Sequence, residues 1–332
     1  MLDLELVAVQ IEEASRLAKI RRLPHLRLAF LLLDNVVEVM LHREVESETF
    51  FQDVNVAMRL QMQRMQPVHG DKPEFMALLT DIESRILPER KMEDLEERFQ
   101  AKVNFLAERK RLDPPVAAIV KKLHRYRNDL YHRLQLRREV LEPATLIYFD
   151  VACAVLANWR FQRSWSSAES YEDLARFGVT VHGLFQEDIT TRIASQLRES
   201  VGMDVSAIRT ALSNHLDGRL DDLDETVSMV RSAMPDEYDD PDDVYRFVQS
   251  DWKNELPAPS ELRELRFPVL GNKLPLWRRQ VASLTDISER YAMYARYATI
   301  EDDFESFEAQ ATALYETIDR LVQQAIDEER GK

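Results

Sequence analysis

Residues 113–133 read DPPVAAIVKKLHRYRNDLYHR, and this stretch predicts a helix with a sharply defined start. Asp113 suits the N-cap, and Pro114 or Pro115 suits the first turn, where a missing backbone N–H costs little. Apolar residues then recur at a spacing near 3.6, which is typical of an amphipathic helix. The helix is expected to pack one face against a helical core.

The same stretch lies in the most basic part of an acidic chain. Residues 109–138 hold ten Lys and Arg against two Asp, a local net charge of +8, whereas the whole chain carries -15. The total charge opposes general affinity for nucleic acid. An acidic body with one basic segment can nevertheless offer a local anion site. The alternative is a solvated helix face that is paired with acidic residues elsewhere.

Outward from this segment, the rest of the chain also has helical periodicity, and we find no alternating strand pattern. Only 7 of the 332 residues are Gly, so turn-rich β architectures are disfavoured. We therefore predict an all-α fold. Further helices are expected at residues 3–20, 24–44, 49–65, 73–87, 90–109, 141–163, 183–199, 204–216, 219–234, 242–254, 278–298 and 300–329, with an irregular stretch at 255–277.

The chain is long enough for two domains. The Ser-rich segment SWSSAES at residues 164–170 is the predicted boundary, which divides the chain into 1–165 and 166–332. Cys153 is the only cysteine, so an intrachain disulfide and a Cys-based zinc site are excluded. A cytoplasmic location is the expectation, because the N-terminus carries acids where a signal peptide is basic, and Asp34 interrupts the apolar run AFLLL.

The chemistry-bearing motif is Arg127, Asn128 and His132, in the order R-N-x-x-x-H. Histidine transfers protons near neutral pH, and arginine stays charged and binds phosphate through two donors. Asn128 can orient either group through hydrogen bonds. Such a set can cleave RNA without a metal, so we predict no cofactor and no metal site. The neighbouring cations are predicted to contact RNA: Lys121, Lys122, Arg125 and Arg133.

Here the sequence resembles the HEPN superfamily (higher eukaryotes and prokaryotes nucleotide-binding domain), whose ribonuclease members carry Arg, a polar residue, a spacer and His. AFLLLDNVVEVML resembles the first core helix of that family, and LHRYRNDLYHR with REVLEPATLIYFDVACAVL resembles its last two helices. The resemblance covers roughly residues 20–163. It implies an N-terminal HEPN-like bundle followed by a second helical region of unknown role, and an endoribonuclease in prokaryotic antiviral defence or a toxin–antitoxin system.

The family also implies partners: RNA, a second copy of the chain, and in some members an antitoxin that modifies a Tyr two residues after the His. Leu134 occupies that position here, which speaks against this mode of control. On an ideal helix Arg127 and His132 lie about 140° apart, so one helix presents them divergently. A homodimer with a composite site across a two-fold axis brings them together.

Two alternatives stay open. One is a non-catalytic HEPN module that binds nucleotide or RNA or serves as a dimerising scaffold, and the other is a helical regulatory protein in which Arg127 and His132 are structural. His124 is expected on the helix surface, with a second catalytic role as the alternative. Tyr126 and Tyr131 either stack on bases or pack in the core. An exposed Arg127 is expected to contribute little to stability.

Overall fold

The computed structural model describes residues 2–69, 72–132, 138–160, 173–178, 188–250 and 257–331, with the backbone alone for residues 2, 3, 69, 128–132, 138 and 139. Every regular element within these ranges is a helix, so the all-α prediction is confirmed. The chain divides into two compact units, Met1–His132 with Tyr148–Gly202 and Arg133–Ile147 with Met203–Lys332. The predicted boundary near residue 165 lies outside the described residues.

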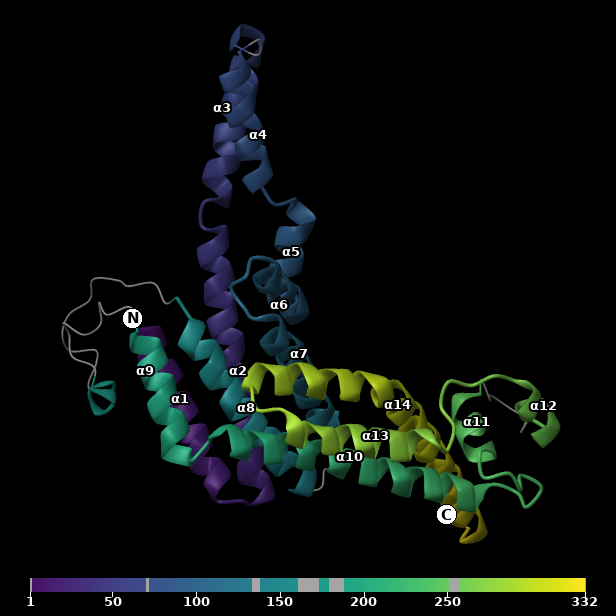
Figure 1. Cartoon of the computed structure of the whole chain (residues 1–332). Helices are drawn as coiled ribbons and strands as arrows, with labels where there is room; N and C mark the ends of the chain where they lie inside the picture. The colour runs from purple at the N-terminus through teal and green to yellow at the C-terminus, as the bar shows by residue number, and fades with distance from the viewer. Residues whose placement is uncertain are drawn as a thin grey trace. The chain divides into compact units, whose positions relative to one another are not determined.

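Helix α2 is the centre of the first unit. It packs against α1, α6 and α7, and its apolar side chains, including Phe30, Leu33 and Val37, are fully buried. The helices of this unit are α1 (Leu2–Lys19), α2 (Leu23–Thr49), α3 (Gln52–His69), α4 (Pro73–Arg85), α5 (Glu89–Glu97), α6 (Phe99–Glu108), α7 (Pro114–His132), the second half of α8 (Arg138–Asn158), the short 3-10 helix η2 (Ala175–Phe177) and α9 (Ile189–Val201) (Figure 1).

Helices α3 and α4 form a hairpin with a small core of its own. Met62, Leu79 and Ile82 are buried between the two helices, with Phe75 and Ile86 packed against them. At the base of the hairpin the Gln52 amide donates to the Leu87 carbonyl at 2.8 Å and accepts from the Leu87 N–H at 3.0 Å. The two helices lie side by side and extend beyond α5 of the same unit (Figure 1).

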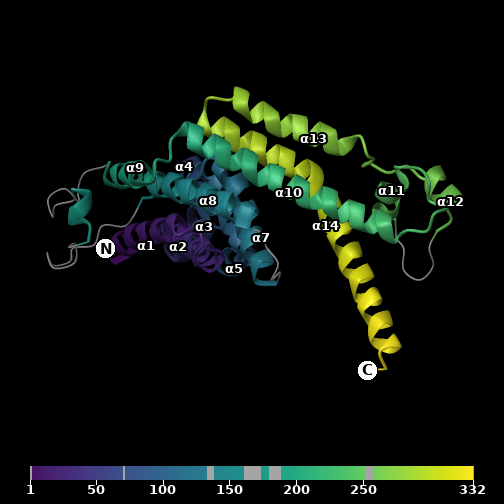
Figure 2. The same cartoon turned by 90° about the horizontal axis from the view of Figure 1, so that it is seen from below.

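The second unit is built on α10 and α14. Its helices are the first half of α8, α10 (Val205–Ala233), α11 (Asp243–Gln249), α12 (Pro259–Glu264), α13 (Lys273–Ala282), the 3-10 helix η4 (Ser283–Asp286) and α14 (Arg290–Glu329). Helices α10, α13 and α14 pack together, and the last turns of α14 continue past the other two (Figure 2). Arg219 of α10 is buried here against Glu301 and Glu308 of α14.

Several predicted helix boundaries are wrong. The single helix expected at 90–109 is two, because Arg98 has an extended backbone with φ -112° and ψ 117°. The two helices expected at 204–216 and 219–234 are one. Helix α10 continues through Gly218. A Cβ at this position would meet the Val140 side chain at 3.1 Å, so the glycine allows close packing and does not form a turn.

Helix boundaries in the C-terminal part of the chain also differ from the predicted ones. The stretch 255–277 contains α12, which has Pro259 in its first turn, and the start of α13. Proline is compatible with the first turn of a helix, so the prolines that suggested irregular structure include one that begins a helix. The break expected near residue 299 lies at residues 283–289, and α14 runs unbroken for 40 residues.

Among the described helices, α8 has the one segment that is long and apolar enough to span a membrane, Val140–Asn158. Most of that segment is buried within the protein. Burial of this kind is typical of the core helix of a soluble protein. Cys153 lies on this helix and is fully buried, in agreement with its expected role as an ordinary core residue.

Candidate functional site

Helix α7 is held firmly in the first unit. It begins at Pro114, directly after Asp113, whose carbonyl accepts a hydrogen bond from the Ala117 N–H at 2.8 Å. Its apolar face packs against α2 and α6, and Val116, Ile119, Val120 and Leu123 are all buried. The start and the apolar face are those that the sequence predicts.

Near the C-terminal end of this buried face, two polar side chains of α7 contact Asp34 of α2. The Asp34 side chain is fully buried, yet it accepts a hydrogen bond from the Tyr148 hydroxyl at 2.6 Å. His124 Nδ1 lies 2.9 Å from the same carboxylate oxygen, and Arg127 Nε lies 3.2 Å from the other. Three helices therefore contribute to one cluster, which we call the Asp34 cluster: Asp34, His124, Arg127 and Tyr148.

Burial makes this cluster energetically demanding. A carboxylate inside a protein costs several kcal/mol unless it is paired and hydrogen-bonded. Asp34 meets that requirement through the Arg127 guanidinium and the Tyr148 hydroxyl. Burial, together with the Asp34 charge, raises the pKa of Tyr148 well above its ordinary value, so this hydroxyl keeps its proton and remains a donor.

Arg127 is oriented by this pairing but is not sealed off. Its side chain is 33% exposed, whereas that of Asp34 is 1% exposed. The guanidinium has five N–H donors, and Asp34 cannot use all of them. One part of the group is therefore fixed by the core, and another part is accessible to solvent. Arg127 is therefore a partly exposed arginine paired with a buried carboxylate, and its small effect on stability stays a prediction.

His124 is also not the surface residue that we expected. Its ring stacks on Phe99 with the ring centroids 3.8 Å apart and the planes 13° from parallel, and its side chain is 15% exposed. Tyr126 packs edge-to-face with Phe30 at 5.8 Å. This contact favours the packing role of Tyr126 over base stacking. The side chain of Tyr131 lies outside the described part of the chain.

The remaining motif residues are placed by the backbone alone. Asn128 and His132 lie in the last two turns of α7, and their side chains are not described. The helical register places positions 121, 125, 128 and 132 on one face, whereas position 127 lies about 140° from position 132. Arg127 is thus on a different side of α7 from position 132, whereas His124 lies one turn before position 128.

The predicted RNA-binding cations differ in accessibility. Arg125 is exposed, and the Lys121 ammonium donates to Asn104 Oδ1 at 3.1 Å. Lys122 is only 6% exposed, which is a poor position for contact with a phosphate backbone. Arg133 lies outside the described residues. Lys121 and Arg125 are one turn apart, so the exposed positive charge follows the same face as positions 128 and 132.

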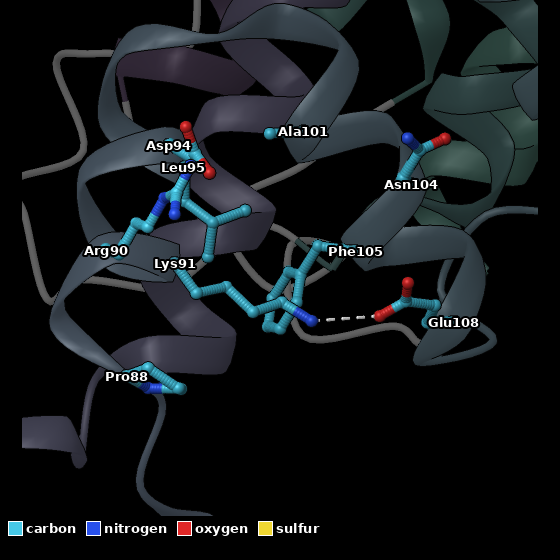
Figure 3. Close-up of a pocket in the computed structure, with 9 residues that line it drawn as sticks. All are labelled: Pro88, Arg90, Lys91, Asp94, Leu95, Ala101, Asn104, Phe105 and Glu108. Carbon is cyan, nitrogen blue, oxygen red and sulfur yellow. Dashed lines mark hydrogen bonds and ion pairs between the residues drawn. The ribbon is translucent and has the colours of Figure 1, made fainter.

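A shallow pocket of about 390 Å³ lies on α5 and α6 (Figure 3). Its lining residues are Pro88, Arg90, Lys91, Asp94, Leu95, Ala101, Asn104, Phe105 and Glu108. The Lys91 ammonium is already paired with Glu108 at 3.1 Å and lies 5.5 Å from the centre of the Phe105 ring. With its lysine paired and its charges mixed, this pocket is a weaker candidate for an anion than α7.

Asp34 and Tyr148 are the residues that sequence reasoning missed. Asp34 carries a usable signal, because a charge that interrupts an otherwise apolar core helix must find partners. Tyr148 carries none, since it lies in an apolar helix where a tyrosine is unremarkable. No group of three or more His, Cys, Asp or Glu in the described part of the chain is arranged to hold a metal. No family model, curated protein or solved structure matches the chain.

Proposed function

We propose that the chain is a HEPN-type endoribonuclease whose site comprises Arg127, Asn128 and His132 of α7. The observation that carries the proposal is the pairing of Arg127 with Asp34 at 3.2 Å. A buried ion pair is a poor source of stability, because replacing it with apolar residues of similar size often leaves the free energy of unfolding unchanged or raises it. A buried carboxylate does, however, hold a guanidinium at a fixed position, as binding of a scissile phosphate requires.

The reaction requires a base, a cation and no metal. His132 takes the proton from a ribose 2′-hydroxyl, and the 2′-oxygen attacks the adjacent phosphorus. The P–O5′ bond breaks, and the 5′-oxygen leaves with a proton that the protonated His132 gives up. The products are a 2′,3′-cyclic phosphate and a 5′-hydroxyl. Arg127 stabilises the charge on the phosphorane, and Asn128 orients the base or the phosphate.

Because positions 127 and 132 diverge on α7, the proposed site is shared by two copies of the chain. Arg127 of one copy faces His132 of the other across a two-fold axis. Lys121 and Arg125 extend the positive surface along the same helix and would bind the RNA backbone. A cytoplasmic setting in antiviral defence or a toxin–antitoxin system, with a regulatory partner, rests on the family resemblance alone.

A second candidate is favoured by one specific observation. Arg127, His124 and Tyr148 together satisfy Asp34, which is what a purely structural cluster also does. In that case the chain is a non-catalytic HEPN module that binds nucleotide or RNA, or a helical regulatory protein. The two candidates differ in whether His132 is needed for chemistry.

The test is cleavage of single-stranded RNA by the purified full-length chain in excess EDTA. The ribonuclease proposal expects cleavage that yields cyclic phosphate ends and is lost in His132→Ala. His42→Ala is the control, because His42 is a half-exposed histidine on α2 that pairs with Glu46 at 3.5 Å and is not part of the motif. Equal cleavage by wild type and His132→Ala would reject the site, and no cleavage by wild type would favour the non-catalytic module.

A further inference from the structure

Helix α3, with the residue before it, carries a row of large apolar side chains that are exposed in the described part of the chain. The members are 42–71% exposed: Phe51 62%, Val54 51%, Met58 42%, Met65 42% and Val68 71%. Phe51 immediately precedes α3 and accepts the hydrogen bond of its first turn from Asn55 at 2.9 Å. A contiguous exposed apolar patch on this scale marks an interaction surface.

The spacing of the row identifies the kind of surface. Together with Gln61, the positions 51, 54, 58, 61, 65 and 68 alternate between steps of three and four residues. This is the a/d pattern of a coiled-coil seam, sustained along the whole of α3. We call this set the α3 stripe. Its geometry fits another helix that packs along the seam.

The α3 stripe is separate from the face that α3 uses inside the hairpin. Met62 is buried against Leu79 and Ile82 of α4, and Met62 lies between the stripe positions 61 and 65 without belonging to them. The buried core of the hairpin therefore does not include the stripe. A further helix can pack on α3 while α4 stays in place.

We propose that the α3 stripe binds the α3 stripe of a second copy of this chain, in parallel orientation. Charge favours a copy of the same helix: the stripe itself holds no charged residue, and α3 as a whole has one acidic and two basic side chains in a chain of net charge -15. Two copies thus meet little charge repulsion along this helix. A strongly acidic or basic partner has nothing here to complement.

The area is sufficient for such a pair. The exposed parts of the five apolar side chains amount to roughly 500 Å² per copy, or about 1,000 Å² in total, which is the lower limit for a specific interface. Phe50 lies beside the seam, is 67% exposed, and packs edge-to-face with Phe51 at 5.0 Å. It enlarges the apolar surface at the base of α3.

Gln61 decides the orientation. In a parallel pair, equivalent positions meet, so the two Gln61 amides face each other and can hydrogen-bond. In the antiparallel register that keeps the seam aligned, Gln61 faces Met58 of the other copy and its amide loses water without a partner. A single polar residue in an apolar seam is a known means of fixing register and orientation. This proposal does not depend on α7 or on ribonuclease activity.

The oligomeric state of the full-length chain is the first test. Sedimentation velocity from about 1 to 100 μM should show a concentration-dependent dimer. An interface at the lower size limit is expected to have a dissociation constant in roughly the micromolar range. Met58→Glu should raise the dimer Kd at least about tenfold, because two charges would then meet in the seam. Leu60→Glu is the matched control, as Leu60 is 47% exposed on the same helix but lies outside the stripe.

Cysteine cross-linking then tests the orientation. Cys153 is buried, so an introduced cysteine is the accessible thiol of each variant. Under mild oxidation Gln61→Cys should form a disulfide-linked dimer, and Leu60→Cys should not. A chain that stays monomeric, or a Met58→Glu variant with wild-type affinity, would overturn the proposal. Cross-linking only between Met58→Cys and Gln61→Cys chains would overturn the parallel orientation.

Discussion

At the scale of single residues, Asp34 explains why Arg127 cannot be treated as a surface side chain. Its carboxylate is buried at the meeting point of α2, α7 and α8, and Arg127 and Tyr148 supply the compensating charge and hydrogen bond. Removal of one partner from such a buried ion pair leaves the other charge buried without compensation. The effect of a substitution here is therefore a loss of stability as well as any loss of function.

Asp34→Asn should lower the free energy of unfolding by about 2–4 kcal/mol, less than for a fully buried pair because Arg127 is partly solvated. The amide keeps the shape of the carboxylate but removes the charge that balances Arg127. Urea unfolding followed by circular dichroism measures the change. Asp53→Asn, at an exposed position on α3, should change stability by less than about 0.5 kcal/mol. Equal free energies of unfolding for the two variants would show that the charge of Asp34 contributes nothing to stability.

His215 of α10 is the clearest titrating group in the second unit. It is buried, and its Nδ1 lies 3.1 Å from the Val140 carbonyl. Burial and the nearby Arg219 cation lower its pKa from 6.5 to about 4. Because the unfolded chain binds this proton at a higher pH than the folded chain, the stability contribution is complete above pH 6.5. It is lost as the pH falls from about 6.5 to 4.

We therefore expect the free energy of unfolding to fall by roughly 3 kcal/mol from this group over that pH range. His215→Gln should flatten this part of the pH dependence, whatever its effect on stability at pH 7. The measurement is urea unfolding at half-unit steps from pH 7.5 to 4. A His215→Gln profile parallel to that of the wild type would show that another group is responsible.

At the scale of elements, the cations of α7 differ in solvent exposure and therefore in their ability to contact RNA. Arg125 is exposed and Lys121 is partly exposed, whereas Lys122 is buried. Lys121→Ala and Arg125→Ala should each weaken RNA binding and reduce the slope of log K against log salt by about 0.7, the value for one contact with a single strand. Lys122→Met should leave that slope unchanged. Fluorescence anisotropy at several salt concentrations checks this, and an equal loss in all three variants would contradict it.

Helix formation and the start of α7 were predictable because they depend on local signals. Periodicity and Pro114 were enough for α7, and the same signals place α1, α4 and the start of α2 close to their observed bounds. The exceptions were positions where tertiary packing overrides local preference. Gly218 lies inside α10 where a Cβ would meet the Val140 side chain, and Arg98 interrupts a strongly periodic run. No local pattern reveals either.

The candidate site was predictable only in part. The motif residues and the basic character of α7 follow from the sequence, but the connection of Arg127 to α2 and α8 does not. Asp34 and Tyr148 are 114 residues apart, so their hydrogen bond requires knowledge of which helices meet. The burial of Lys122 was missed for the same reason, since a lysine in a basic run is ordinarily solvated.

At the scale of the whole molecule, the proposed site needs two chains. A mixture of Arg127→Ala and His132→Ala proteins should recover part of the activity that each lacks. A mixed dimer contains one shared site without either group and one that retains both. The measurement is RNA cleavage after subunit exchange, with exchange verified by mass-tagged chains. Absence of recovery despite verified exchange would contradict a shared site while leaving open a site within one chain.

The most direct measurement of the central claim compares activity and stability in Arg127→Lys. Lysine keeps the positive charge beside Asp34 but lacks the planar pair of N–H donors through which arginine binds phosphate bidentately. We expect the melting temperature to change by only a few degrees, or about 1 kcal/mol, while the rate of RNA cleavage in EDTA falls by about 100-fold or more. Cleavage at the wild-type rate by a folded Arg127→Lys protein would contradict the account, because Arg127 would then serve the fold and not the reaction.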